Sequence, residues 1–232
     1  MKGLIKRSAQ KVKEILTNEG KINVRDQGII NFIDVGSVGK LPSPWLENSQ
    51  YIKNLLKFEP RDPKTKHPNV ISVDTALWSE NSWKDFYIYK GKKGSGSSLF
   101  KQNYEYVKQN FENLRNRGSE KLAESWFERS QLDKVEKISC RTLDSVINEI
   151  SPSFPYHFLK IDAQGAEYQI LQGAESFLKQ DCIGIQLELF VIPLYEGIKL
   201  LPEVEDYLSQ LGFEMVKKFP AHGSFASQHD CL

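Results

Sequence analysis

Four acidic residues stand at the ends of short apolar segments that predict β-strands. In chain order they are Asp34, Glu59, Asp162 and Glu188. Ligands of open α/β sheets bind along the edge formed by the carboxyl ends of the parallel strands. We therefore expect these carboxylates to share one site, where such groups can attract a cation, orient a substrate or accept a proton.

The first of these acids opens a turn that carries two glycines. Asp34 is followed by Gly36 and Gly39, whereas a dinucleotide-binding turn has glycine at the position of Asp34. A carboxylate there repels a diphosphate at a cost of several kcal/mol. It favours S-adenosylmethionine, which has no phosphate and carries an ammonium and a sulfonium, and Gly36 lets the backbone approach such a ligand. The alternative is an ordinary turn capped by the Asp side chain.

A second acid supports a nucleoside ligand. Glu59 follows the next predicted strand, twenty residues after Gly39, and an acid at such a place accepts hydrogen bonds from both ribose hydroxyls. NAD and S-adenosylmethionine share this ribose, so Glu59 does not choose between them. A solvent-facing Glu before a turn at Pro60 is the alternative. The next strand end carries Asp74 and Ala76, where we expect the adenine.

The composition argues against several other classes. The 31 Lys and Arg nearly balance the 30 Asp and Glu, so the chain lacks the basic excess that usually accompanies nucleic-acid binding. The cysteines are few and widely spaced, which suits a reducing cytoplasm and neither a disulfide framework nor a metal motif. No apolar run is long enough to span a membrane. Residues 1–27 predict a helical extension that packs on the domain rather than on a membrane, and homo-oligomer formation stays open.

The elements that must position the acids alternate between strand and helix. The predicted strands are 29–34, 55–58, 70–73, 86–89, 135–139, 158–161, 183–189 and 213–218, and the clearest helices are 143–149, 166–179 and 203–211. Such alternation predicts a doubly wound, mostly parallel α/β sheet in a single domain spanning 1–232. Residues 90–132 interrupt the pattern and predict an inserted loop or helical lid. Residues 228–232 look like a last strand that the end of the chain cuts short.

The most distinctive stretch is residues 157–174, which read His-Phe-Leu-Lys-Ile-Asp-Ala-Gln-Gly-Ala-Glu-Tyr-Gln-Ile-Leu-Gln-Gly-Ala. A strand brings Lys160 and Asp162 to its tip, and Gly165 allows a sharp entry into a helix. This stretch resembles the FkbM-type methyltransferases. The resemblance extends over roughly residues 30–232 through Asp-Val-Gly-Ser-Val-Gly at 34–39, Phe-Glu-Pro at 58–60, Gly-Ser-Ser at 96–98, Thr-Leu-Asp-Ser-Val at 142–146 and Gln-Leu-Glu at 186–188.

The resemblance implies a class I methyltransferase: a Rossmann-like sheet of seven strands with the last one antiparallel. It also implies S-adenosylmethionine as cosubstrate and O-methylation of a hydroxyl on a small molecule, sugar or glycan. By motif position Asp34, Gly36 and Gly39 would hold the methionine end of the cosubstrate and Glu59 its ribose. Asp162 would lie at the mouth of the acceptor site.

Transfer of a methyl group to oxygen is helped by a base near the acceptor hydroxyl. With two acids assigned to the cosubstrate, Asp162 is the candidate base or acceptor orienter and Glu188 the second candidate. Asp162 has an alternative role as a helix cap, and Glu167 is expected to complement the helix dipole. We expect no metal, because two carboxylates make a thin ligand set. The candidates for the acceptor pocket are Ser97, Ser98, Trp78 and Tyr195.

Three functional hypotheses follow. The leading one is an O-methyltransferase. A dinucleotide-dependent oxidoreductase using NAD(P) shares Glu59 and the glycine turn but is disfavoured by Asp34. A non-catalytic binding module stays open because Ser37-Val38 replaces the Ala-Asn usual in the family. Residues 40–45 also depart from the family, since they are proline-rich where a helix ordinarily begins.

Overall fold

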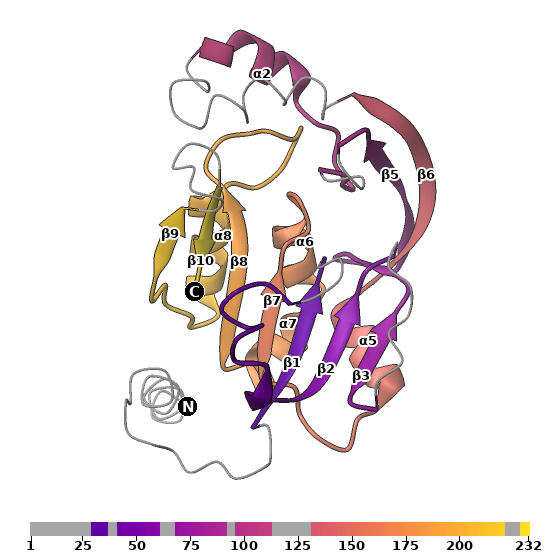
Figure 1. Ribbon diagram of the computed structural model, residues 1–232, viewed down its shortest axis with the longest axis vertical. Helices are drawn as coiled ribbons and strands as arrows, with labels where there is room; N and C mark the ends of the chain where they lie inside the picture. The colour runs from indigo at the N-terminus through magenta and orange to yellow at the C-terminus, as the bar shows by residue number, and fades with distance from the viewer. Residues whose placement is uncertain (1–28, 37–40, 61–67, 92–95, 113–130, 221–227) are drawn as a thin grey trace.

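The computed structural model describes residues 29–36, 41–60, 68–91, 96–112, 131–220 and 228–232 (Figure 1). The helical extension expected for residues 1–27 and the glycine at position 39 lie outside these residues. None of the described helices is long and apolar enough to cross a membrane.

The main sheet has seven strands, of which β10 runs antiparallel to its two neighbours. Their order across the sheet is β3 (Val70–Val73), β2 (Ile52–Phe58), β1 (Ile30–Val35), β7 (Phe158–Ile161), β8 (Gly184–Phe190), β10 (Gln228–Cys231) and β9 (Lys218–Pro220). The five strands from β3 to β8 are parallel. The order turns back at β1 and β7, where ligands of such sheets bind. The predicted α/β fold with a mostly parallel seven-stranded sheet is confirmed.

Five α-helices belong to the described part of the chain. They are α2 (Tyr104–Gln109), α5 (Leu143–Ile150), α6 (Glu167–Gln172), α7 (Glu175–Gln180) and α8 (Leu201–Gln210). The single helix expected over 166–179 is therefore two helices that part at Gly173. The break has a tertiary cause, because the Asp144 carboxylate accepts hydrogen bonds from the backbone N–H groups of Ser176 and Phe177 and so caps α7.

One face of the main sheet is apolar. Every second residue of the central strands points to this face. These residues form one core cluster with α5, α6, α7 and α8, which cover the face (Figure 1). The rows pair Leu56, Ile33, Leu159 and Ile185 in one layer and Phe58, Val35, Ile161 and Leu187 in the next. The helices thus cover this face and leave the polar residues of the strands to the opposite one.

The opposite face begins with an aromatic layer. Trp45 lies with its ring centroid 4.7 Å from that of Phe32 and 4.5 Å from that of Phe158. The segment that carries Trp45, residues 41–51, forms a turn and a short 3-10 helix (Ser49–Tyr51) rather than the α-helix that commonly follows the first strand. Pro42 and Pro44 each remove a backbone donor, which explains why no α-helix forms here.

A second, three-stranded sheet stands beside the main one (Figure 1). It consists of β4 (Ala76–Leu77), β6 (Leu132–Arg141) and β5 (Ser82–Tyr89), with β5 and β6 antiparallel. The predicted strands 86–89 and 135–139 belong here and not to the parallel sheet. The expected insertion at 90–132 contains α2 in its described part. The strand expected at 213–218 reaches the sheet only from Lys218 onward, as β9.

The α6–α7 break yields a test of packing. Gly173 has an ordinary φ of −76°, yet a Cβ atom there would lie 2.1 Å from the carbonyl oxygen of Trp78. Since the obstacle is backbone, we expect Gly173→Ala to lower the free energy of unfolding by about 2–3 kcal/mol in urea denaturation. The control is Gly197→Ala, where φ is +74° and a Cβ meets nothing within 4 Å. That change should cost only about 1 kcal/mol for the left-handed backbone, and equal losses in the two variants would contradict the packing account.

Candidate active site

A row of polar side chains crosses the middle of the sheet on the face opposite the helices. Asp34 in β1 lies in register with Lys57 in β2 on one side and with Lys160 in β7 on the other. Lys160 is in turn opposite Gln186 in β8. Lysines are seldom buried unless they are paired, yet both lysines here are less than a tenth exposed. The row therefore places unlike charges next to one another inside the sheet.

Lys160 joins two of the predicted acids. Its Nζ lies 3.5 Å from Oδ1 of Asp34 and 3.7 Å from Oδ2 of Asp162. The Asp34 side chain is fully buried, whereas that of Asp162 is 35 % exposed. Lys57, in register with Asp34 on its other side, adds a second basic side chain to this group. Asp162 is therefore the member of the group that is open to solvent.

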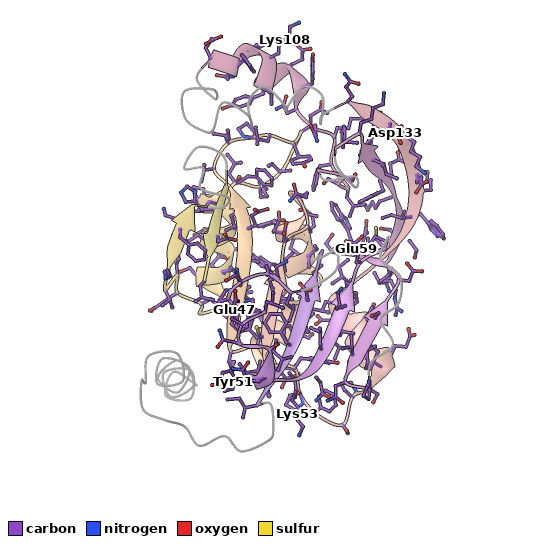
Figure 2. All side chains as sticks on the ribbon, in the orientation of Figure 1. Glu47, Tyr51, Lys53, Glu59, Lys108 and Asp133 are labelled. Atoms are coloured by element: carbon purple, nitrogen blue, oxygen red, sulfur yellow. The ribbon has the colours of Figure 1, made fainter. Side chains whose placement is uncertain are left out.

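The next positions toward the strand tips form an acidic rim, which we define as Glu59, Asp162 and Glu188. We call the row of Lys57, Asp34, Lys160 and Gln186 the polar row. Each acid of the rim lies two residues beyond a member of this row, and alternation along a strand keeps it on the same face. Glu59 and Glu188 are largely buried. Figure 2 shows Glu59 just beyond the end of β2. Three of the four acids singled out from the sequence thus form the rim, and the fourth supports it from the row below.

Gly36 occupies the rim position in β1, and only glycine fits there. Its φ is +83°, and a Cβ would come 1.9 Å from the backbone carbonyl oxygen of Asp162. Its N–H donates to the carbonyl of Phe58, while the N–H of Asp162 donates to that of Val35. Gly36 is therefore packed directly against the turn after β7, and the rim has backbone but no side chain between Glu59 and Asp162.

Gln164, which is not among the residues predicted for the site, connects the rim to the rest of the site. Its Nε2 donates to Oδ1 of Asp162 at 3.0 Å and to Oε2 of Glu188 at 3.2 Å. Its backbone has φ of +53°, which is rare for a residue with a long side chain. Gly165 follows with φ of +100°. The signal available in the sequence was the Asp-Ala-Gln-Gly string, in which a polar residue stands between the acid and the glycine of the turn.

The other side of the Gln164 amide faces Tyr195. The Tyr195 hydroxyl lies 3.1 Å from Oε1 of Gln164 and 2.8 Å from the carbonyl oxygen of Gly96. Since a phenol has one proton, these two acceptors share it, and the contact to Gly96 is the shorter. Burial raises the pKa of Tyr195 well above 10, with the nearby acids adding to the effect, so the phenol stays neutral. Two residues predicted for the site, Tyr195 and Asp162, are thereby joined through Gln164.

The two predicted serines tie the insertion to two neighbouring parts of the chain. Ser98 donates from Oγ to the backbone carbonyl of Gln164 at 2.7 Å and accepts from the N–H of Phe100 at 3.0 Å. Ser97 accepts a hydrogen bond from the N–H of Tyr89. Both serines are buried. The Ser98 hydroxyl therefore holds the 96–100 segment against the turn after β7, and the Ser97 hydroxyl holds it against β5.

The remaining predicted residues follow β3 in the chain: Asp74 precedes β4, Ala76 begins it and Trp78 follows it. Asp74 is exposed and Ala76 half-buried, both close in sequence to the end of β3. Trp78 packs against the main core, with its ring centroid 5.4 Å from that of Phe100. The structure thus places Trp78 within packing contacts, and Asp74 at a strand end open to solvent.

Glu167 is a buried carboxyl close to the acidic rim. It is almost entirely buried, and its Oε1 accepts a hydrogen bond from the N–H of Ala163 at 2.8 Å. Burial raises its pKa to about 8, and the charges of Asp162 and Glu188 push in the same direction. Asp162 does not cap α6, since the N-cap position is Ala166 and no side chain caps it.

Metal and thiol chemistry find no support in the described part of the chain. No group of three His, Cys, Asp or Glu residues there could hold a metal ion. All three cysteines are free, and burial raises the pKa of Cys140 to about 11 and that of Cys182 to about 12. Such thiols stay protonated and are poor nucleophiles.

The strand order and the antiparallel strand β10, with acids at the switch point, define a class I methyltransferase fold of Rossmann type. A family model described as "Methyltransferase FkbM domain" matches residues 42–215, about three quarters of the chain. The chain belongs to this family and is a methyltransferase, which confirms the resemblance inferred from the sequence. No curated protein and no solved structure matches the chain. The match includes Glu59, Asp162 and Glu188 and begins after Asp34.

The buried Glu167 makes stability depend on pH. Its folded pKa of about 8 lies above the ordinary 4.5, so folding takes up a proton between these pH values. The contribution of this protonation is complete below pH 4.5 and is lost as the pH rises through 8. Glu167→Gln cannot titrate, so its free energy of unfolding relative to the unmodified chain should rise between about pH 5 and pH 8.5 in urea denaturation.

A surface glutamate provides the opposite control. A hydrogen bond from Lys199 lowers the pKa of Glu203, so its contribution is present above the ordinary pKa and lost as the pH falls through the folded value. Glu203→Gln should therefore be least stable relative to the unmodified chain near neutrality and approach it in acid. A pH-independent difference between Glu167→Gln and the unmodified chain would contradict the assignment of the raised pKa.

Proposed function

We propose that the chain is an S-adenosylmethionine-dependent O-methyltransferase that acts on a hydroxyl of a small molecule, sugar or glycan. The observation that carries this proposal is the acidic rim at the carboxyl ends of β2, β7 and β8. Carboxylates gathered at this edge of the sheet favour a cationic ligand, and S-adenosylmethionine carries both an ammonium and a sulfonium. A dinucleotide would bring a diphosphate to the same edge and be repelled.

The residues present fit this cosubstrate. Glu59 is buried beyond β2, where a carboxylate can accept both ribose hydroxyls. The missing side chain at Gly36 lets the turn after β1 pack against the Asp162 carbonyl, and the methionine end would lie beside these two turns. Gly39, also assigned to the methionine end, follows three residues later in the sequence. Asp34 would support the site by pairing its charge with that of Lys160. Asp74 and Ala76 would flank the adenine. When bound, the cosubstrate supplies an electrophilic methyl group.

The acceptor hydroxyl must be aligned and must lose its proton. Asp162 is our candidate base, because it is the rim acid with the more exposed side chain and it belongs to the turn at the sheet's switch point. In this role its carboxylate takes the proton of the acceptor O–H, while the Nζ atom of Lys160 lies 3.7 Å from Oδ2 of Asp162. Glu188 is the second candidate. Alignment itself can contribute several kcal/mol of the barrier reduction.

Gln164 is a positioning residue in this scheme. Its amide holds Asp162 and Glu188 together, and the Oε1 atom faces Tyr195. Ser98 fixes the backbone of the same residue. We therefore assign Ser98 and Tyr195 to shaping the acceptor side of the site, with Ser97 and Trp78 in the surrounding wall.

We also propose a cytoplasmic location, which the three free cysteines support.

A non-catalytic binding module is the second candidate function. The observation that favours it is the loop after β1, where a proline-containing turn replaces the usual first helix. Membership of a methyltransferase family speaks against the NAD(P)-dependent oxidoreductase that the glycine turn by itself allowed.

Calorimetric titration with S-adenosylhomocysteine tests the proposal. We expect a Kd on the order of micromolar for the unmodified chain and at least a tenfold loss in Glu59→Gln, which removes a charged acceptor of ribose hydrogen bonds. Glu47→Gln is the matched control, because Glu47 is exposed on the segment after β1. Absence of binding by the folded, unmodified chain would overturn the cosubstrate assignment. Binding of NAD in its place would favour the oxidoreductase, and equal binding by both variants would remove Glu59 from the site.

A further inference from the structure

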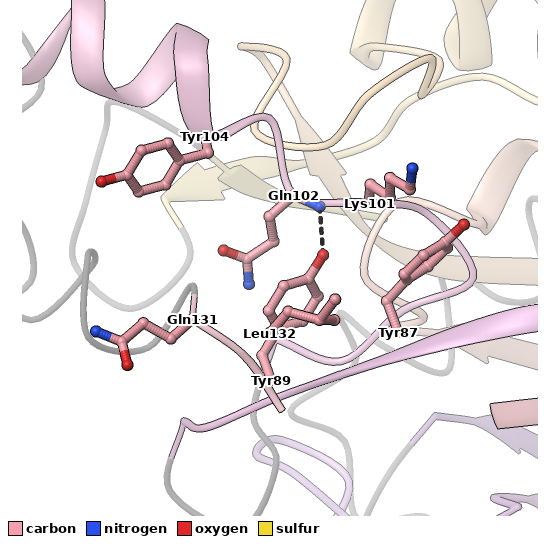
Figure 3. A pocket seen from close by; sticks show the side chains of 7 residues that line it. All are labelled: Tyr87, Tyr89, Lys101, Gln102, Tyr104, Gln131 and Leu132. Carbon is pink, nitrogen blue, oxygen red and sulfur yellow. Dashed lines mark hydrogen bonds between the residues drawn. The ribbon is translucent and has the colours of Figure 1, made fainter. Parts of the chain in front are cut away.

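A cavity of about 400 Å³ lies between the second sheet and the inserted segment (Figure 3). Its lining residues are Tyr87, Tyr89, Lys101, Gln102, Tyr104, Gln131 and Leu132. This volume falls within the range of about 300–1,000 Å³ that is common for small-molecule sites. The cavity is built by the end of β5, the start of β6 and the residues that lead into α2, and none of its lining residues belongs to the acidic rim.

The lining combines aromatic faces with donors and one cation. Three of the seven residues are tyrosines, two are glutamines, and none carries a carboxylate. The Nζ atom of Lys101 lies 5.7 Å from the centroid of the Tyr87 ring. A tyrosine ring offers an apolar face and a polar edge, and an ammonium offers up to three donors to an anion. The cavity is therefore suited to a ligand with an apolar face, several hydroxyls and a negative charge.

The cavity is tied to the proposed acceptor side of the site by a short chain of contacts. The Tyr89 hydroxyl accepts a hydrogen bond from the backbone N–H of Gln102 at 2.7 Å, as Figure 3 shows. Gln102 forms an isolated antiparallel bridge with Tyr195. Tyr195 in turn faces the amide of Gln164, which holds Asp162. One layer of residues thus separates the cavity from the turn that carries the candidate base.

We propose that this cavity binds an anionic sugar unit of the methyl acceptor. A sugar ring has C–H faces that pack on tyrosine rings, and its hydroxyls can exchange hydrogen bonds with the phenols and the two glutamine amides. Lys101 would pair with a carboxylate or phosphate on the ring. The assignment of this sugar to the acceptor rests on the proposed function, whereas sugar binding by the cavity can be measured without methyl transfer.

The test is a titration of the full chain, followed by NMR, with glucuronate and with glucose 6-phosphate. Glucose serves as the neutral probe. We expect saturable binding of both anions with a Kd on the order of millimolar, and weaker binding of glucose. Lys101→Gln should weaken the anions about fivefold and leave glucose unchanged, because it removes the charge and keeps a polar side chain. Tyr104→Ala should weaken all three sugars.

Lys108→Gln is the matched control, since Lys108 is an exposed lysine of α2 that does not line the cavity. The proposal is overturned if the anions bind no more tightly than glucose, or if Lys101→Gln and Lys108→Gln bind them equally. S-Adenosylhomocysteine is titrated on the same samples. Its binding without sugar binding refutes the cavity alone, and sugar binding without it refutes the methyltransferase site alone.

Discussion

The site depends on a buried ion group in the centre of the sheet. Asp34 has no exposed surface, and a carboxylate in that position is stable only beside a cation. Lys160 on the adjacent strand supplies the charge and extends to Asp162 at the tip. Removing one partner of such a buried group typically costs about 3–5 kcal/mol. Because Lys160 contacts both acids, the pairing of β1 with β7 and the position of Asp162 depend on the same side chain.

The buried ion group is compatible with a stable core because the two faces of the sheet differ in polarity. The residues that point toward the helices are uniformly apolar. The other face passes from the aromatic layer around Trp45 through the polar row to the acidic rim. The indole N–H of Trp45 donates to the Gln186 side chain, which joins the aromatic layer to the polar row. Apolar burial on the helix-covered face thus stabilises a sheet whose opposite face carries charged groups at one edge.

Gln164 contacts three parts of the chain next to the acidic rim: Asp162, Glu188 and Tyr195. An amide has both a donor and an acceptor end, and here the donor end faces two carboxylates while the acceptor end faces Tyr195. A residue of this length rarely adopts a left-handed backbone, which costs about 1 kcal/mol or more. These contacts, together with Gly165 and Ser98, hold it there. The loop that presents the candidate base is therefore fixed by its neighbours and not by a helix cap.

Much of this architecture was predictable from the sequence, because apolar runs that end in an acid indicate strand tips at a common edge. The parallel sheet and the family followed from those runs and from the stretch 157–174. The polar row did not, because a lysine inside a strand gives no sign of its partner in another strand. The helix break at Gly173 was hidden for a similar reason: the apolar stripe continues across it, and the cap comes from Asp144 in another helix.

The second sheet and the role of Gln164 also depend on tertiary contacts. Periodicity predicts that residues 86–89 and 135–139 are strands but says nothing about which sheet they join. The hydrogen bonds of Gln164 involve positions as far apart in sequence as Glu188 and Tyr195. The predicted roles of Asp34, Glu59, Asp162 and Glu188 toward ligands stay predictions, although the structure brings these acids to one edge.

A crystal structure of the chain with S-adenosylhomocysteine would show whether the acidic rim is the cosubstrate site. We expect the ribose hydroxyls within hydrogen-bond reach of Glu59, the amino-acid end beside Gly36, and the sulfur facing the side of the rim where Asp162 is exposed. A ligand bound away from this edge, or bound here with Asp162 turned from the sulfur, would contradict this expectation.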